Sequence, residues 1–284
     1  MQKTVKTIAS ANQLIASFEQ ALHLNGNRIP KGPLYAGVDL GTANIVTAVV
    51  DKNGSPVAGA LTGGRSIIRD GLIVDYIRAI DILKRQINVL RNAGYLVQEA
   101  AVAYPPGTGG RNIKAFGNVL AAVGLKVVGL IDEPTAASIV LNVQNGAVVD
   151  IGGGTTGISV IKNGSVIYTA DEPTGGTHVD LTIAGHYKVQ DHQAEQMKLD
   201  PERQAEIFPL IRPVFQKMAS IVNMHLRENP VENLYLVGGT SCFPGIETVI
   251  QDDTGLSVVR PYNPLLVTPL GIALGLLKNK LIEF

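Results

Sequence analysis

Val38-Asp-Leu-Gly-Thr42 and Val149-Asp-Ile-Gly-Gly153 are two versions of one short stretch, and together they decide the fold. In each version an apolar run predicts a buried strand, which ends in an aspartate and opens into glycine. The turn Lys52-Asn-Gly-Ser55 follows the first version, and Lys162-Asn-Gly-Ser165 follows the second. The aspartates, at 39 and 150, lie 111 residues apart and the turns lie 110 apart, so one deletion aligns the two stretches. We infer an internal duplication that gives the chain two halves of related fold.

Strand patterns and helix patterns alternate along the rest of the chain. Short apolar runs indicate strands, whereas apolar residues at every third or fourth position indicate helices. Strands are predicted at residues 34–40, 45–50, 97–104, 127–131, 147–151, 158–161, 166–169 and 234–237. Helices are predicted at residues 76–90, 112–123, 134–140, 186–198, 207–226, 245–251 and 269–277. This alternation predicts the α/β class.

The first 33 residues carry a separate pattern. Apolar residues spaced three to four apart over residues 5–22 predict an amphipathic helix, which Asn25-Gly26 ends. Arg28-Ile-Pro-Lys-Gly-Pro33 is typical of a linker, since two prolines and a glycine prevent regular pairing. The helix either packs on its own domain or serves as a detachable docking peptide.

The composition excludes several classes of protein. The 284 residues are 45% hydrophobic and 17% charged, with 24 basic residues against 24 acidic ones. A neutral chain is not expected to be a general nucleic-acid binder or a polybasic membrane-surface protein, and its apolar content excludes extensive disorder. The single cysteine, Cys242, excludes an intramolecular disulfide and a cysteine zinc site. The sequence has no secretory signal and no apolar run long enough to span a membrane, so we expect a cytoplasmic protein.

The two glycine-rich stretches have the residue types that a phosphate site needs. Glycine lets backbone N–H groups approach phosphate oxygens without a Cβ in the way, and a threonine hydroxyl adds another donor. An aspartate at the end of each strand, Asp39 and Asp150, supplies a hard oxygen for a hydrated Mg²⁺ ion. Two such hairpins facing each other across a cleft would grip one polyphosphate, whereas either hairpin alone is also compatible with an ordinary glycine turn.

Three further segments fit such a cleft, and neither a Walker P-loop nor a Rossmann fingerprint occurs. Asp132-Glu-Pro-Thr-Ala-Ala137 places Glu133 at a strand end, where it either orients a water in line with a γ-phosphate or only caps a helix. Val237-Gly-Gly-Thr-Ser241 is a buried strand that opens into glycines, which suits close approach of adenosine or a plain turn. Pro269-Leu-Gly-Ile-Ala-Leu-Gly275 predicts a helix whose small residues permit close packing.

These five segments, in this order, resemble the motifs of the actin, sugar-kinase and heat-shock ATPase superfamily. The resemblance covers residues 34–277 and implies an actin-like (ribonuclease H-like) α/β fold, in which two duplicated lobes flank a nucleotide cleft. It implies that residues 34–146 form lobe I, which residues 269–284 complete, and that residues 147–268 form lobe II. Residues 1–33 are then the N-terminal helix and its linker.

The resemblance also implies a role for each matched residue. Asp39 and Asp150 match catalytic carboxylates that hold Mg²⁺ through water, and Glu133 matches the acid that positions the attacking water. The residues that match nucleotide-binding positions are Gly41, Thr42, Gly152, Gly153, Gly154, Thr155, Gly238 and Gly239, with Glu195 and Lys198 as a looser match on the ribose and adenine side. Two positions depart from the heat-shock type: Gly157 replaces a carboxylate, and Cys242 replaces an arginine that lies against the base.

Within the superfamily, the chain most closely resembles the chaperone-like proteins of bacterial ethanolamine-utilisation operons, and residues 69–76 and 194–198 are similar to MreB-type bacterial actins. This resemblance implies an ATPase switch, with ATP or ADP and Mg²⁺ as cofactors, that acts as a chaperone or assembly factor. The implied partners are ethanolamine-utilisation enzymes or the shell proteins of a bacterial microcompartment, with which the cytoplasmic protein would associate. The alternatives are a nucleotide-binding scaffold or actin-like filament subunit with little hydrolysis, and so a homo-oligomer, or a small-molecule kinase.

Overall fold

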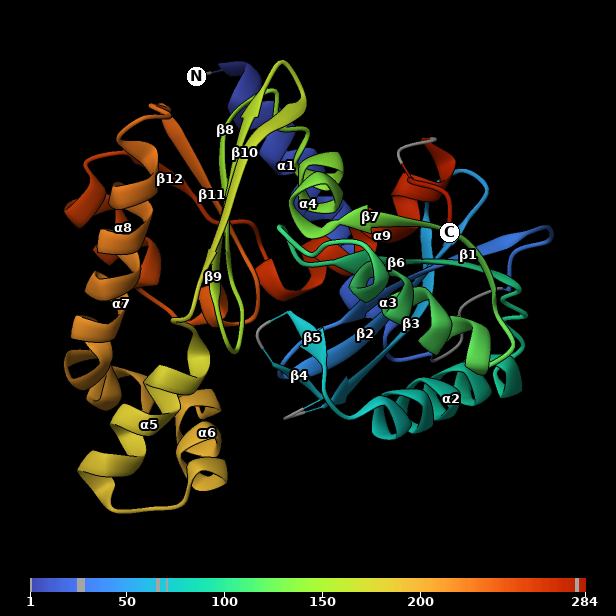
Figure 1. Ribbon diagram of the computed structural model, residues 1–284, viewed down its shortest axis with the longest axis horizontal. Helices are drawn as coiled ribbons and strands as arrows, with labels where there is room; N and C mark the ends of the chain where they lie inside the picture. Colours follow the sequence, from blue (N-terminus) through green and yellow to red (C-terminus); the bar gives the residue numbers. More distant parts are fainter. Residues whose placement is uncertain (1, 25–28, 65–66, 70, 279–280) are drawn as a thin grey trace.

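The chain folds into two halves, each built around a five-stranded mixed sheet (Figure 1). The computed structural model describes residues 2–24, 29–64, 67–69, 71–278 and 281–284. We call the half around the first sheet lobe I and the half around the second sheet lobe II. The predicted α/β class and the predicted pair of related halves are confirmed.

The two sheets have the same strand order and the same directions. The lobe I sheet has the order β3-β2-β1-β6-β7, formed by β1 (Leu34–Leu40), β2 (Asn44–Asp51), β3 (Pro56–Gly63), β6 (Glu99–Tyr104) and β7 (Lys126–Asp132). The lobe II sheet has the order β10-β9-β8-β11-β12, formed by β8 (Asn145–Ile151), β9 (Thr156–Lys162), β10 (Ser165–Glu172), β11 (Asn233–Val237) and β12 (Ser257–Val259). The first two strands of each lobe pair antiparallel, and β1–β6 and β8–β11 pair parallel. A small two-stranded sheet joins β4 (Ile68–Arg69) to β5 (Leu72–Ile73).

The duplication extends to the register of the first hairpin. Asp39 pairs with Val46 in lobe I, and Asp150 pairs with Gly157 in lobe II. The turn N–H of Gly41 donates to the Asn44 carbonyl at 2.9 Å, and the N–H of Gly152 donates to the Thr155 carbonyl at 3.1 Å. Each of these positions lies 111 residues from its counterpart, so the two hairpins match residue for residue.

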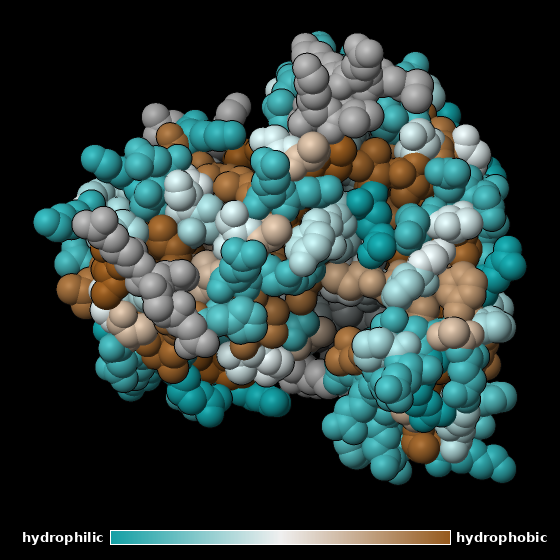
Figure 2. All heavy atoms as spheres, turned by 180° about the vertical axis from the view of Figure 1, so that it is seen from behind, coloured by the Kyte–Doolittle hydropathy of each residue, from teal (hydrophilic) through white to brown (hydrophobic). Residues whose placement is uncertain are grey.

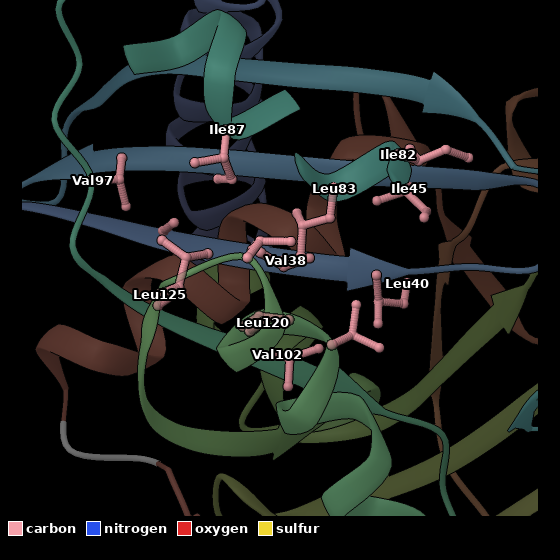
Figure 3. Packing of buried hydrophobic residues seen from close by; sticks show 14 of the residues in the cluster. Val38, Leu40, Ile45, Ile82, Leu83, Ile87, Val97, Val102, Leu120 and Leu125 are labelled. Atoms are coloured by element: carbon pink, nitrogen blue, oxygen red, sulfur yellow. The ribbon is translucent and has the colours of Figure 1, made fainter. Parts of the chain in front are cut away.

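Each sheet buries its outer face under helices of its own lobe. In lobe I, α2 (Tyr76–Asn92) and α3 (Arg111–Ala122) pack on the sheet, and Figure 3 shows Leu83 and Ile87 of α2 directed toward the strand that carries Val38. The Asp75 carboxylate caps α2 by accepting from the N–H of Arg78. Lobe II is covered by α5 (Gly176–Tyr187), α6 (Asp191–Leu199), α7 (Gln204–Leu226) and α8 (Ile246–Thr254).

The inner faces of the two sheets meet around two central helices, α4 (Glu133–Leu141) and α9 (Val267–Leu277). Small residues let these helices touch, because a Cβ at Gly271 of α9 would collide with the carbonyl of Ala136 in α4. On its other side α9 lies so close to β1 that a Cβ at Gly37 would collide with the backbone of Ala273. The close packing predicted for the Pro269 helix is therefore present.

The N-terminal helix α1 (Gln2–Ala21) packs on the chain's own core. Ile15 and Phe18 are fully buried, and the Phe18 ring lies against Gly59 of β3. The Glu19 carboxylate accepts hydrogen bonds from the Tyr262 hydroxyl at 2.7 Å and the Asn263 amide at 2.6 Å. A detachable docking peptide would need this apolar face to be free, so the first of the two alternatives holds. The predicted helix stop at residues 25–26, linker residue 28 and residue 70 of the MreB-like segment lie outside the described residues.

One helix differs from the prediction. The predicted helix at residues 186–198 is the end of α5 followed by most of α6, with Lys188 in left-handed backbone at φ 54° between them. Glycine is a poor helix former, so the pair Gly175-Gly176 hides the start of α5 in the sequence. The N–H groups at that start are held by carbonyls of a neighbouring loop, as described below.

Near the C-terminus, Ile282 exchanges backbone hydrogen bonds with Leu130 of β7 at 2.8 and 2.9 Å. The lobe boundaries at residues 34–146, 147–268 and 269–284 stay a prediction. None of the helices in the described ranges is long and apolar enough to cross a bilayer.

Candidate functional site

The two glycine-rich turns face each other where the lobes meet. A Cβ added at Gly153 would lie 3.2 Å from the Cβ of Ala43, and one added at Gly154 would lie 3.5 Å from the hydroxyl of Thr42. These short distances show that the turn after β8 lies next to the turn after β1. Figure 2 shows the surface hollowed between the two lobes, beside the projecting pair α5 and α6.

Hydrogen bonds to its carbonyl groups fix the backbone of the lobe II turn, residues 152–155. The Gly152 carbonyl accepts from the N–H of Gly176 at 2.9 Å and from the hydroxyl of Thr240 at 2.8 Å. The Gly153 carbonyl accepts from the N–H of Thr177 at 2.8 Å. In a trans peptide the carbonyl and the following N–H point in opposite directions. The N–H groups of Gly153 and Gly154 therefore point away from α5, as a phosphate-binding turn requires.

The predicted carboxylates project from the inner faces of the two sheets. In β1, Val38 belongs to the outer core of lobe I, so the next residue, Asp39, points inward. In β8, Val149 belongs to the outer core of lobe II, so Asp150 points inward as well. Glu133 is the first residue of α4, directly after the helix-capping Asp132, whose carboxylate accepts from the N–H of Thr135 at 2.9 Å. Asp39, Asp150 and Glu133 are half-buried as whole residues.

Mutual repulsion and burial shift the pKa values of all three groups upward. Burial, followed by the Asp150 charge, raises the pKa of Asp39 to about 7. Burial, followed by the Asp171 charge, raises the pKa of Asp150 to about 7, although the Thr268 side chain acts in the opposite direction. Burial, followed by Asp150 and Asp39, raises the pKa of Glu133 well above its usual range. Among the described residues, the charged groups that raise these three pKa values are all carboxylates, and a divalent cation would supply positive charge to such a cluster.

The arrangement fits a cation held through water molecules. Within the described ranges, no three His, Cys, Asp or Glu side chains are grouped so as to ligate a metal directly. The carboxylates are instead distributed over β1, β8 and the start of α4. Hydrated Mg²⁺ keeps several of its waters and accepts such outer carboxylates.

The predicted adenosine loop lies against the second turn. Gly238 follows β11 with φ +89°, a conformation that favours glycine, and a Cβ there would collide with the Asp150 carboxylate. Its N–H donates to the Pro264 carbonyl at 3.1 Å. Gly239 leads into the short 3-10 helix η1 (Thr240–Cys242), and burial raises the pKa of the Cys242 thiol.

Lys198 lies close to these loops. Glu195, the other residue predicted on the ribose and adenine side, lies on the same helix. The Lys198 ammonium pairs with the buried Asp180 carboxylate at 2.7 Å and would lie 3.5 Å from a Cβ at Gly176. Glu195 is half-buried on the same helix, α6. The nucleotide-contact roles of both residues stay predictions.

Sequence reasoning assigned no individual role to three polar residues around the loops at 152–155 and 238–241. The Thr240 hydroxyl donates to the Gly152 carbonyl, the Thr268 side chain of α9 acts to lower the pKa of Asp150, and Asp171 of β10 acts electrostatically on Asp150 and Glu133. The return strand was predicted to end at Thr169, because Asp-Glu-Pro-Thr-Gly-Gly is typical of a loop. The strand in fact continues to Glu172.

Known proteins resemble this chain in sequence and in fold. The family model described as MreB/Mbl protein matches residues 65–201, and the one described as type IV pilus assembly protein PilM matches residues 140–270. The ethanolamine utilization protein EutJ of Escherichia coli strain K12 is 42% identical over 245 residues, which are 86% of this chain and 86% of that protein. The cell shape-determining protein MreB of the same strain is 24% identical over 81% of this chain and 84% of its own length.

Solved structures of EutJ and MreB proteins have the same fold as this chain. The crystal structure of EutJ from Carboxydothermus hydrogenoformans has a TM-score of 0.89 and 45% identity, and covers 94% of this chain and 98% of its own. MreB5 of Spiroplasma citri bound to ADP has a TM-score of 0.70 and 20% identity, and covers 88% of this chain and 99% of its own. A structure of MreB5 bound to AMPPNP has a TM-score of 0.71. The predicted actin-like fold is confirmed.

Proposed function

The chain belongs to the EutJ family of ethanolamine utilization proteins, and on that premise we propose that it is an ATP-driven switch in ethanolamine utilisation. ATP with Mg²⁺ binds between the lobes, and its hydrolysis to ADP changes how the lobes sit together. The observation that carries this proposal is the pair of register-matched hairpins, whose turns face each other. The first strand of each hairpin carries a half-buried aspartate next to its last residue. The binding of ADP and AMPPNP by an actin-like relative supports it.

Each part of the nucleotide has residues of this chain to hold it. The phosphates take N–H groups of the two turns, from Thr42 on one side and from Gly153, Gly154 and Thr155 on the other. Gly41 and Gly152, whose own N–H groups close the two turns, leave room for the phosphates to approach. Asp39 and Asp150 hold Mg²⁺ through water, and the ion supplies positive charge to the phosphates and to the carboxylate cluster. Gly238 and Gly239 leave room for the adenosine, with Glu195 and Lys198 beside it.

Glu133 is the residue that we assign to the hydrolytic step. Nearby positive charge lowers the pKa of a carboxyl group, so Glu133 becomes an ionised acceptor once the negative charge of Asp39 and Asp150 is balanced. An ionised carboxylate at the start of α4 can accept a hydrogen bond from a water and orient it toward the γ-phosphate. The half-buried position limits other water around it.

We assign the switch to a chaperone or assembly role in the cytoplasm, in association with a bacterial microcompartment. Its partners are ethanolamine-utilisation enzymes or shell proteins that distinguish the ATP-bound from the ADP-bound arrangement of the lobes. The apolar face of α1 is occupied by the core, so these partners bind elsewhere on the surface.

Steady-state phosphate release tests the proposal. We expect slow, Mg²⁺-dependent release from ATP by the wild type, and a loss of about a hundredfold for Glu133→Gln. The affinity for ATP should change little, because the amide keeps the shape of the side chain. Exposed Glu202→Gln is the matched control and should behave as the wild type. Equal losses of rate and affinity in Glu133→Gln would mean that Glu133 is structural.

The likeness to MreB favours one alternative, an actin-like filament subunit that binds nucleotide and hydrolyses it little. Sedimentation at high speed separates the two functions. A filament subunit enters the pellet when ATP and Mg²⁺ are added, whereas a switch of the proposed kind stays in the supernatant and releases phosphate.

A further inference from the structure

Three neighbouring strands of lobe II carry a row of residues that lobe I does not repeat. In lobe II, Asp150 on β8 pairs with Gly157 on β9, which pairs in turn with Asp171 on β10. The equivalent row in lobe I runs from Asp39 through Val46 to Leu61. The duplicated hairpins thus differ at two positions of one row: an apolar pair in lobe I corresponds to a glycine and a carboxylate in lobe II.

The glycine in the middle of this row leaves space between two carboxylates. A Cβ built on Gly157 would lie 3.6 Å from Oδ1 of Asp171 and 3.8 Å from the Cβ of Asp150. Both distances are ordinary van der Waals contacts, so position 157 could hold a side chain, and Asp171 reaches the place where such a side chain would begin. The Asp171 carboxylate therefore lies on the inner face of the sheet, although its strand, β10, is one strand further from β8 than β9 is.

Asp171 also acts on the other acidic groups of the site. Among charged groups, it has the largest effect on Asp150, and it acts on Glu133 as well. Asp171 therefore belongs to the same electrostatic group as Asp150 and Glu133.

We propose that Asp171 is a third carboxylate of the Mg²⁺ site, which supplies from β10 the oxygen that position 157 cannot supply. This inference rests on the proposed nucleotide-binding function. Together with Asp39 and Asp150, Asp171 would hold the hydrated ion, and it would thereby set how much Mg²⁺ strengthens nucleotide binding.

Titration calorimetry with ADP, in the presence of Mg²⁺ and in the presence of EDTA, tests this assignment. Asp171→Asn keeps the shape of the side chain and removes its charge. We expect it to reduce the gain in ADP affinity that Mg²⁺ gives by about tenfold or more. Affinity in EDTA should hold or rise, because one negative charge near the phosphates is gone. Exposed Asp252→Asn, in the same lobe, is the matched control.

A second variant separates a metal role from a structural one. Adding Gly157→Asp to Asp171→Asn returns a carboxylate to the same space from β9 and should restore most of the Mg²⁺ gain. A merely structural Asp171 would lower the melting temperature without changing the ratio of the two affinities, and that result would overturn the assignment. A full Mg²⁺ gain in Asp171→Asn would overturn it too. If the wild type itself binds no ADP with Mg²⁺, the proposed function fails and this assignment fails with it.

Discussion

Asp39 and Asp150 make the stability of the ligand-free protein depend on pH. The pKa of each is raised from 3.8 to about 7 in the folded chain. Between these values the folded chain keeps protons that the unfolded chain has released. The stability contributed by the protonated groups is therefore complete below the lower value and is lost as the pH rises through about 7.

Urea unfolding checks this sign. We expect the free energy of unfolding of the wild type to be lower at about pH 8 than at about pH 5, and the difference to shrink in Asp150→Asn. The comparison between variant and wild type isolates this group from the other titrating residues. A pH dependence that is the same in both proteins would contradict the burial and repulsion assigned to Asp150.

Single residues of the site differ in how well the sequence predicts them. Asp39, Asp150 and Glu133 were predicted because each lies at or next to the end of a strand, in one of the short motifs that the chain displays in order. No individual role was assigned to Asp171, Thr240 or Thr268, because their places at the site depend on the pairing of strands and on loops far away in sequence. Contacts of that kind exist only after the chain has folded.

The contact between α4 and α9 depends on the absence of a side chain at Gly271. We expect Gly271→Ala to destabilise the protein by about 1–3 kcal/mol, because the added methyl group would collide with the Ala136 carbonyl and push two central helices apart. Gly185→Ala is the matched control: Gly185 lies in α5, is exposed, and has open space around a built Cβ. That change should be neutral or stabilise by about 0.5–1 kcal/mol. Equal effects of the two substitutions in urea unfolding would show that α4 and α9 do not need the close approach.

Replacing Phe18 tests how much the packing of α1 contributes to the stability of the fold. Its ring is fully buried, so Phe18→Ala should cost about 3–5 kcal/mol in the free energy of unfolding. The exposed neighbour Gln20 provides the control, and Gln20→Ala should change stability by no more than about 0.5 kcal/mol. If Phe18→Ala and removal of residues 1–24 both leave the melting curve unchanged, the helix is detachable and the docking alternative returns.

Helices and strands were predictable where the pattern of apolar residues was regular. α2 follows its three-to-four spacing, and the strands of both hairpins follow the aspartate-glycine stretches. α5 was hidden by its glycines, since its start is fixed by hydrogen bonds to the carbonyls of Gly152 and Gly153 and not by its own propensity. The prediction cut β10 short for a similar reason, because its last residues are polar and resemble a loop.

The molecule as a whole is two copies of one architecture that meet at their inner faces. The same strand order, the same hairpin register and the same turn hydrogen bond recur in both lobes. The spacing of the two stretches predicted this duplication, but it could not predict how close the turns come. That closeness results from α4 and α9, which set the distance between the sheets.

The central claim is that the two hairpins form one nucleotide site, to which each lobe contributes an indispensable aspartate. Titration calorimetry of ATP with Mg²⁺ on the wild type, Asp39→Asn and Asp150→Asn tests this claim most directly. The claim predicts one bound nucleotide per chain for the wild type and no measurable binding to either variant, while circular dichroism shows that both variants stay folded. Binding that persists in both variants, or that is lost in only one of them, would contradict a single site shared by the two lobes.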